Sequence, residues 1–528
     1  MIALLDYGAG NVRSVINAIE SLGEKVKVVA GSEDILSAEK LVFPGVGAFG
    51  NMMQILEKKN YVEPLKEYLR SDRPFLGICL GLQALFEKSE EATDIKGLGI
   101  ISGSVKRLAV DLSIPHIGWN GLNIRKPSRI FDGLYGDEKF YFVHSFEVVP
   151  KDNAPILTTT DYGCRFVSSI QMGNVIATQF HPEKSGTAGL CILKNFLKSG
   201  AEETSPLYVS RRTQLAKRII ACLDVRSNDQ GDLVVTKGDQ YDVRENGAVR
   251  NLGKPVKLAR RYYEEGADEI TFLNITGFRD FPLKDMPMLE VLKETSKNVF
   301  VPLTIGGGIR DYTDKDGRRY SALEVASEYF RSGADKISIG SDAVLIVEEY
   351  LKNGRKTGKS AIEEISRVYG NQAVVISIDP RRVYVESPAG IKHHVIETTT
   401  AGPNGERYCW YQCTIKGGRE GRELDAVTLA RVCEELGAGE ILLNCIDKDG
   451  TNSGFDIELI NAVKEVVSIP VIASSGAGCA EHFCEVFTKT EAESALAAGI
   501  FHRRKVSIAD VKRCLKGKVE VRADDTLK

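Results

Sequence analysis

The sequence has 528 residues, which at roughly 150 residues per domain indicates two or more domains. Hydrophobic residues make up 43% and charged residues 27%, a globular composition that disfavours a disordered, collagen-like or coiled-coil protein. The 69 basic and 72 acidic residues nearly balance, so the composition gives no indication of a broad nucleic-acid-binding surface.

The N-terminal segment enters a strand-and-turn pattern at once and lacks the basic and apolar regions of a leader peptide. No run of about 18 apolar residues predicts a membrane span. We therefore expect a cytoplasmic protein. Cys409 and Cys413 are spaced like half of a metal site, but the eleven cysteines show no zinc-type pattern, so we expect incidental thiols and no metal.

The first 200 residues alternate strand and helix patterns. Strands are predicted at 2–8 and 25–31 with an amphipathic helix at 11–23 between them, and two later segments combine a strand with a turn, at 40–50 and 73–89. The stretch 139–185 is richer in strand patterns, and a last helix follows at 189–197. This order predicts a three-layer α/β domain.

Gly, Ser, Pro and charged residues at 199–211 interrupt the pattern and indicate a domain boundary. We predict an N-terminal domain at 1–203, a linker at 204–211 and a second domain at 212–528. Because the linker is short, we expect the two domains to be docked against each other.

A cysteine lies between the predicted strand and helix of segment 73–89. Gly77 and Gly81 flank Cys79, and glycines permit the sharp turn that presents a nucleophile at a helix N-terminus. His181 and Glu183 follow another apolar strand, where the acid can orient the imidazole as a base. A cysteine after an apolar strand is more often a buried hydrophobe, but the combined pattern favours a catalytic triad.

A glycine-rich turn at 44–47 could present a backbone N–H near this cysteine, and the N–H of Leu80 could supply a second donor to an oxyanion. The peptide groups around Val46 could rotate such a donor into or out of the site, because glycines flank this residue.

The second half repeats itself. Four segments recur after a nearly constant interval, namely 219–226 as 375–382, 266–277 as 437–450, 301–311 as 469–479 and 336–344 as 494–502. Each is a short apolar strand followed by helical sequence. The repeat predicts a (β/α)₈ barrel built from two half-barrels, with polar insertions near 311–320, 350–370 and 384–420.

Polar residues close the predicted barrel strands at the end where such barrels hold their active sites. Asp224 follows strand 1 and Asp379 follows strand 5, so both carboxylates face one cavity and suit general acid–base catalysis, with helix capping as the alternative. The repeat-related segments 306–308 and 474–476 suit two phosphate-binding turns. The long polar stretch 225–251 is a candidate lid.

Four charged residues begin barrel strands and could neutralise one another in a ring around the barrel axis, the alternative being routine strand-entrance charges. They are Arg218, Glu269, Lys336 and Glu440.

Five motifs occur together in the first 200 residues: DYGAGN, PGVGAFG, GICLGLQ, PHIGWN and HPEKS. Together they resemble class I glutamine amidotransferases, in particular the glutaminase of the imidazole glycerol phosphate synthase family. The resemblance implies that Cys79 forms a thioester with glutamine and that His181 protonates the departing ammonia. It also implies that Gly47, Gln83 and Ser145 surround the bound glutamine.

The second half resembles the cyclase of the same family through AKRIIACLDV, VTKGDQY, TIGGGIRD, GADKISIG, GAGEILLNCIDKDG and ASSGAG. The fused arrangement is similar to the bifunctional fungal and plant form. The resemblance implies that ammonia passes through a salt-bridged gate, formed by the four strand-entrance charges. It then reacts with a bis-phosphorylated aminoimidazole-carboxamide ribonucleotide to give imidazole glycerol phosphate, and aminoimidazole-carboxamide ribonucleotide is released.

By the same resemblance no metal or organic cofactor is needed, and the fused chain is expected to be a monomer. The substrate- and phosphate-binding residues that we expect are Lys237, Gly307, Gly308, Ser341, Asn444, Asp449, Gly450, Ser475, Gly476, Ala498 and Gly499. Three positions depart from the bacterial pattern: Asn274, Gly340 and Ser475. Two alternatives stay open, a barrel with another ammonia acceptor and a catalytically silent metabolite-binding scaffold, although the intact triad disfavours the second.

Overall fold

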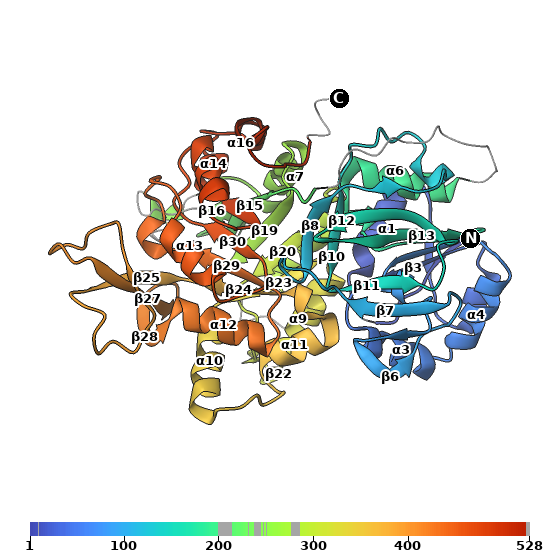
Figure 1. Cartoon of the computed structure of the whole chain (residues 1–528), viewed down its shortest axis with the longest axis horizontal. Helices are drawn as coiled ribbons and strands as arrows, with labels where there is room; N and C mark the ends of the chain where they lie inside the picture. The colour runs from blue at the N-terminus through green and yellow to red at the C-terminus, as the bar shows by residue number, and fades with distance from the viewer. Residues whose placement is uncertain are drawn as a thin grey trace.

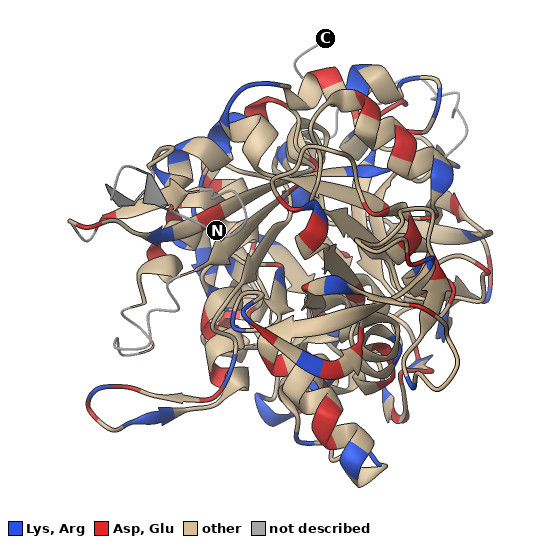
Figure 2. Ribbon diagram, turned by 90° about the vertical axis from the view of Figure 1, so that its left-hand side faces the viewer, with Lys and Arg blue, Asp and Glu red and all other residues tan. Residues whose placement is uncertain are grey.

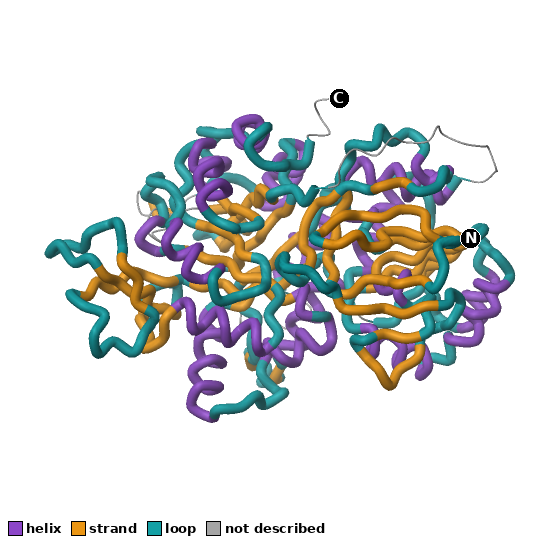
Figure 3. Tube along the Cα trace, in the orientation of Figure 1, coloured by secondary structure: helices purple, strands orange, loops and turns teal. Residues whose placement is uncertain are grey.

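The computed structural model describes residues 1–8, 10–198, 214–230, 232–236, 244–245, 248–249, 251–275, 283 and 286–523. Two α/β units lie side by side, the N-terminal one in blue to teal and the C-terminal one in green to red (Figure 1). Strands occupy the middle of each unit and helices lie around them (Figure 3). The predicted α/β architecture with two different halves is confirmed.

The N-terminal unit is built on a twelve-stranded mixed sheet. Its parallel part contains β2 (Val26–Val28), β1 (Ile2–Leu4), β3 (Lys40–Gly45), β4 (Phe75–Cys79) and β14 (Val175–Thr178). Its other strands are β13 (Cys164–Met172), β12 (Ile156–Tyr162), β11 (Phe146–Pro150), β7 (Gly103–Arg107), β5 (Lys88–Ser89), β6 (Ala92–Lys96) and β9 (Asn123–Ile124). A separate antiparallel pair is formed by β8 (His116–Asn120) and β10 (Phe140–His144).

Helices cover this sheet because their apolar side chains follow a helical period. The helices are α1 (Val12–Ser21), α2 (Ser32–Ser37), α3 (Phe49–Lys58), α4 (Val62–Arg70), α5 (Leu80–Gln83) and α6 (Gly186–Leu197). In α1, for example, Val15, Ala18 and Ile19 are buried while Glu20 is exposed. The helix predicted at 73–89 is shorter than expected, since α5 has only four residues.

The C-terminal unit is a closed barrel of eight parallel strands, as the internal repeat predicts. The strands are β15 (Arg218–Ser227), β19 (Glu269–Asn274), β20 (Leu303–Gly306), β23 (Lys336–Ile339), β24 (Val374–Ile378), β29 (Glu440–Asn444), β30 (Val471–Ser474) and β31 (Ser494–Ala497). Pairing of β31 with β15 closes the barrel. Around it lie α7 (Pro255–Glu264), α8 (Pro287–Ser296), α9 (Ala322–Arg331), α10 (Ser341–Asn353), α11 (Ala361–Tyr369), α12 (Ala426–Leu436), α13 (Ile457–Lys464), α14 (Ala480–Lys489), α15 (Gly499–His502) and α16 (Ile508–Leu515).

The polar insertions contain more regular structure than the sequence predicts. The third one forms a four-stranded sheet that projects at the left of Figure 1, with β25 (Pro380–Val385), β26 (Val395–Glu397), β27 (Tyr408–Ile415) and β28 (Glu420–Asp425). In β27 the buried residues form two runs, 409–411 and 413–415, so the alternation that indicates a half-buried strand is missing. The first contains the hairpin β21 (Tyr312–Thr313) and β22 (Arg319–Tyr320), and α11 occupies much of the second.

The candidate lid at 225–251 is in part a strand. Within it, β16 (Leu233–Thr236) pairs antiparallel with the end of β15, so this part of the predicted loop is wrong. A second pair joins β17 (Arg244–Glu245) to β18 (Ala248–Val249). Lys237 and the predicted linker 204–211 lie outside the described residues.

The N-terminal unit docks at the end of the barrel where the strands begin. The Trp119 indole N–H donates to the carbonyl of Asp268 at 3.0 Å, and the Arg522 guanidinium lies 4.3 Å above the indole ring. On another side, Lys184 Nζ lies 2.6 Å from a carboxylate oxygen of Asp335, and both side chains are largely buried. These contacts fix one face of the N-terminal unit against the base of the barrel.

Basic and acidic residues are interspersed over the elements that face the viewer in Figure 2. This mixture agrees with the nearly balanced composition. Within the described residues, no helix is both long and apolar enough to cross a membrane.

Candidate active sites

Cys79 occupies a strained turn between β4 and α5. Its φ of 55° and ψ of −103° are unusual for a residue with a side chain, and such conformations cost about 1–3 kcal/mol. A Cβ atom at Gly81 would lie 2.1 Å from the carbonyl oxygen of Phe43, and one at Gly77 would lie 2.7 Å from that of Gly81. The two glycines therefore allow the close packing that holds the turn.

His181 and Glu183 lie at the end of β14, the strand that neighbours β4. His181 Nδ1 is 2.8 Å from Glu183 Oε1, and both side chains are 4% exposed. Burial alone would lower the pKa of His181, but the charges of Glu183 and Cys79 outweigh it and raise this pKa to about 10. His181 Nε2 is buried with no hydrogen-bond partner in the described part of the chain. The imidazole therefore retains its proton more readily than an exposed histidine does.

Gln179, which sequence reasoning missed, joins two predicted residues. Its side-chain N–H donates to Cys79 Sγ at 3.3 Å, and its carbonyl oxygen accepts from Gln83 at 3.1 Å. The Ser145 hydroxyl instead donates to the Asn371 side chain of the barrel unit at 3.3 Å. The structure thus links Gln83 to Cys79 through one side chain and places Ser145 where the two units meet.

The turn at Val46 is tied on both sides. The Tyr7 hydroxyl donates to the Val46 carbonyl at 2.6 Å, and burial raises the pKa of Tyr7, which keeps the donor protonated. A Cβ atom at Gly47 would lie 2.9 Å from the Val368 carbonyl oxygen in the barrel unit. The Val46–Gly47 peptide therefore lies between a hydrogen bond of its own unit and the surface of the other one. Tyr7 was missed, although it belongs to the motif DYGAGN.

The mouth of the barrel contains a cavity of about 660 Å³. Its lining includes every predicted substrate-binding residue that the structure describes, namely Gly307, Gly308, Ser341, Asn444, Asp449, Gly450, Ser475, Gly476, Ala498 and Gly499. Four basic residues that the sequence did not single out also line it, namely Arg310, Lys416, Arg419 and Arg503. The lining also includes four aspartates, so the basic residues and the glycine-rich turns, and not a net positive charge, are what suit a phosphorylated small molecule.

Asp224 and Asp379 both line this cavity. An Asp379 carboxylate oxygen accepts from the Asn444 side-chain amide at 2.9 Å. Burial raises the pKa of Asp379, so its carboxyl group retains a proton more readily than an exposed aspartate. Asp224 lies at the same end of β15 and is 8% exposed.

The two predicted phosphate-binding turns have related backbone conformations. Gly307 and Gly308 have φ values of 91° and 79°, and Ser475 and Gly476 have values of 71° and 93°. A Cβ atom at Gly307 would lie 2.3 Å from the Asn274 carbonyl oxygen, which explains the glycine. Ser475 adopts the left-handed conformation in spite of its side chain, at a position where glycine is usual in the bacterial pattern.

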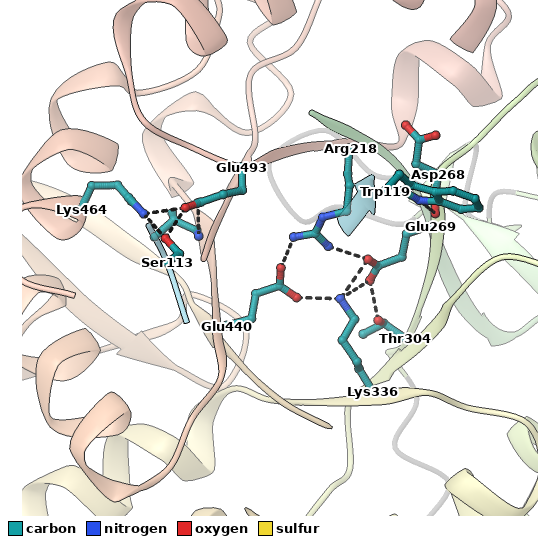
Figure 4. A network of polar contacts seen from close by, with 11 residues as sticks. Ser113, Trp119, Arg218, Asp268, Glu269, Thr304, Lys336, Glu440, Lys464 and Glu493 are labelled. Atoms are coloured by element: carbon teal, nitrogen blue, oxygen red, sulfur yellow. Dashed lines mark hydrogen bonds and ion pairs between the residues drawn. The ribbon is translucent and has the colours of Figure 1, made fainter. Parts of the chain in front are cut away.

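The four strand-entrance charges meet in one buried cluster, the charge ring (Figure 4). Arg218 donates to Glu269 at 2.7 Å and also to Glu440, and Lys336 Nζ lies 2.7 Å and 2.6 Å from the same two carboxylates. All four side chains are at most 1% exposed. Burial alone would raise the pKa of Glu440, but the two cations outweigh it and lower this pKa.

A small cavity between the two units has one residue of the charge ring and one of the predicted triad in its lining. Both His181 and Lys336 line it, together with Val46 and Tyr141. Among the described residues, no cluster of three or more His, Cys, Asp or Glu side chains could hold a metal ion.

Two family models match the chain. A class-I glutamine amidotransferase model matches residues 3–199, and a histidine biosynthesis protein model matches residues 218–507. The chain is 60% identical over 530 residues to the chloroplastic imidazole glycerol phosphate synthase hisHF of Arabidopsis thaliana, covering 99% of this chain and 89% of that one.

It is 56% identical over 532 residues to hisHF of Schizosaccharomyces pombe, covering 98% of each chain. The synthase subunit HisH of Aquifex aeolicus is 50% identical over 203 residues, which are 38% of this chain and 98% of that subunit. The chain therefore belongs to the imidazole glycerol phosphate synthase family of histidine biosynthesis, in the bifunctional form that fuses a glutamine amidotransferase to a cyclase barrel.

Proposed function

We propose that Cys79 is the nucleophile of the glutaminase reaction. Its sulfur attacks the side-chain amide carbon of glutamine, and His181 gives its Nε2 proton to the departing ammonia. His181 then takes a proton from the water that hydrolyses the thioester, while Glu183 holds the imidazole through Nδ1. The buried 2.8 Å contact between the imidazole and the carboxylate supports these roles.

Backbone N–H groups of Leu80 and of the Val46–Gly47 peptide are proposed to stabilise the oxyanion, with Gln83, Gly47 and Ser145 binding glutamine. The hydrogen bond from Tyr7 fixes the orientation of this peptide in the structure. Because the same turn contacts the barrel unit, a shift of the barrel surface could rotate it.

In the barrel, Asp379 and Asp224 are proposed to act as general acid and general base on the ring-forming intermediate. The raised pKa of Asp379 suits the acid. The two phosphates of the substrate are proposed to bind at 306–308 and 474–476, with Ser341, Asn444, Asp449–Gly450 and Ala498–Gly499 completing the site. Lys237 is also proposed to contact the substrate, and this proposal rests only on the resemblance to the family.

Ammonia is proposed to pass from one site to the other inside the protein, because ammonium released to water is not nucleophilic. The observation that carries this proposal is the small cavity between the two units, because its lining includes both His181 of the proposed glutaminase site and Lys336 of the charge ring. Arg218, Glu269, Lys336 and Glu440 would then form the gate at the base of the barrel.

The test is a mass balance on the full chain with glutamine and the bis-phosphorylated ribonucleotide. We expect equal amounts of glutamate and imidazole glycerol phosphate when glutamine is the nitrogen source. When ammonium salts replace glutamine, we expect imidazole glycerol phosphate to form without glutamate. Persistent excess of glutamate with saturating acceptor would contradict internal transfer.

We further infer domain boundaries at 1–203, 204–211 and 212–528. We infer a monomer, since both domains lie in one chain, and we propose a cytoplasmic location. Limited proteolysis tests the boundaries, because cleavage should start in the linker. Sedimentation at several protein concentrations tests the monomer, and cell fractionation tests the location.

A further inference from the structure

Two cysteines that are far apart in the sequence meet on the outside of the barrel. Cys484 of α14 and Cys514 of α16 have their sulfur atoms 2.8 Å apart. The two helices lie next to each other at the upper left of Figure 1. A disulfide bond is about 2.05 Å long, so the two sulfurs need to approach by only about 0.8 Å to form one.

A lysine lies beside this pair. Lys518 Nζ is 3.3 Å from Cys484 Sγ and 3.8 Å from Cys514 Sγ. A neighbouring ammonium group favours the thiolate form of a cysteine, which is the reactive form. The hydrogen bond between the thiols raises the pKa of Cys514, and the contact with Cys484 also raises the pKa of Lys518. The ammonium group therefore lies nearer to Cys484 than to Cys514.

Exposure distinguishes the two thiols. Cys484 is 8% exposed, which admits a small reagent but not a bulky one, whereas Cys514 is partly exposed. A metal site is disfavoured, because no cluster of three suitable ligands occurs in the part of the chain that the structure describes. The geometry therefore fits a thiol pair that reacts with a small oxidant.

We propose that Cys484 and Cys514 form a redox modification site, closing to a disulfide when the protein meets a peroxide. The Cys484 thiolate attacks one peroxide oxygen and the O–O bond breaks, which gives a sulfenic acid and a hydroxide that takes a proton to become water. The Cys514 sulfur, after losing its proton, then attacks Cys484 Sγ. The S–O bond breaks and a second water leaves, so that two thiols are oxidised while one peroxide is reduced.

The bond would join two segments with different surroundings. Helix α14 follows the turn 474–476 at the barrel mouth, and α16 leads into the segment 519–523. In that segment Glu520 pairs with Lys139 of the glutaminase unit at 2.8 Å, and Arg522 lies over Trp119. Oxidation would therefore tie the helix behind a cavity-lining turn to the segment that contacts the other unit.

The experiment uses the full chain treated with hydrogen peroxide and mapped by mass spectrometry without reduction. We expect a cross-linked peptide pair containing Cys484 and Cys514, lost on reduction with dithiothreitol. The map distinguishes this pair from oxidation of Cys79. Hydrogen exchange in α14 and α16 should slow about threefold or more in the oxidised form, because the bond restrains local opening.

Variants test the assigned roles. Cys514→Ser should stop the reaction at a sulfenic acid on Cys484, detected as one added oxygen on the Cys484 peptide, whereas Cys191→Ser, which changes another partly exposed cysteine, should leave the cross-link intact. Lys518→Gln should slow cross-linking about threefold or more, and Lys518→Arg should restore it. The proposal is overturned if no cross-link forms, or if Lys518→Gln leaves its rate unchanged.

Discussion

The charge ring at the base of the barrel allows a prediction whose size can be worked out from the structure. Glu440 pairs with both Arg218 and Lys336, and all three side chains are almost fully buried. Glu440→Gln keeps the shape of the side chain but removes one negative charge. The ring, which has two positive and two negative members, would then carry a net positive charge inside the protein.

The expected cost follows from the contacts. Two unit charges 2.6 Å apart attract each other by about 6 kcal/mol at an effective dielectric constant of about 20. Removing one partner of a buried ion pair typically costs about 3–5 kcal/mol. Because Glu269 still contacts both cations and the new amide still accepts a hydrogen bond, we expect the lower value, a loss of about 3 kcal/mol in the free energy of unfolding.

Urea unfolding, monitored through the hydrogen exchange of barrel peptides, measures this loss of stability. The molar ratio of glutamate to imidazole glycerol phosphate measures how well glutamine hydrolysis is coupled to synthesis in the barrel. We expect the ratio to rise above one, since a ring with unbalanced charge no longer closes the base of the barrel. Glu423→Gln makes the same chemical change at a side chain that is 90% exposed, and it should change stability by less than about 0.5 kcal/mol.

The dependence on pH gives a second measurement. The pKa of Glu440 is lowered in the folded protein, so its stabilising contribution is complete above its ordinary value of 4.5 and is lost as the pH falls through the lowered value. The stability difference between wild type and Glu440→Gln should therefore shrink in acid. A difference below about 1 kcal/mol at neutral pH would refute the assigned ion pairing, and an unchanged ratio would refute the gate.

Three further predictions concern the two reaction sites. Cys79→Ala should abolish glutamine-dependent synthesis but retain synthesis from ammonium salts; loss of both in a folded variant would contradict separate sites. Asp224→Asn and Asp379→Asn should each lower the ammonia-dependent rate by about 10²–10⁴-fold while substrate binding persists. Losses below tenfold in both variants would favour the alternative that these residues only cap helices. Tyr7→Phe removes the hydrogen bond that holds the Val46 carbonyl, worth about 1 kcal/mol. Glutaminase activity without barrel ligand should therefore change about fivefold, rising where the bond holds the Gly47 N–H away from the oxyanion and falling where it holds it in place. An unchanged rate would mean that this bond does not restrain the turn.

The triad candidates could be predicted from the sequence because the residues next to each of them along the chain indicate a catalytic role. Glycines beside Cys79 and the short spacing of His181 and Glu183 are local features of the chain. Gln179 and Tyr7 escaped notice because their partners, Cys79 and Val46, lie 100 and 39 residues away. Only the folded sheet brings such residues together.

The barrel was predictable because each of its four strand patterns occurs twice along the chain. The sheet in the third insertion has no repeated pattern of this kind. Most side chains of β27 are buried, including Cys409, Tyr411 and Cys413, so this strand lacks the alternating pattern that would have indicated it. The pairing of Cys484 with Cys514 was equally hidden, since it depends on how α14 packs against α16.

In the turn around Cys79, the residues needed for packing differ from the residue proposed to carry out the reaction. Gly77 and Gly81 are fixed by backbone atoms that a methyl group would strike, whatever residue stands between them. A related synthase that used free ammonia in place of glutamine could therefore lose the cysteine and keep both glycines. A comparison that scores this turn by its glycines would then count silent and working copies alike, whereas the proposed nucleophile at position 79 distinguishes them within the turn.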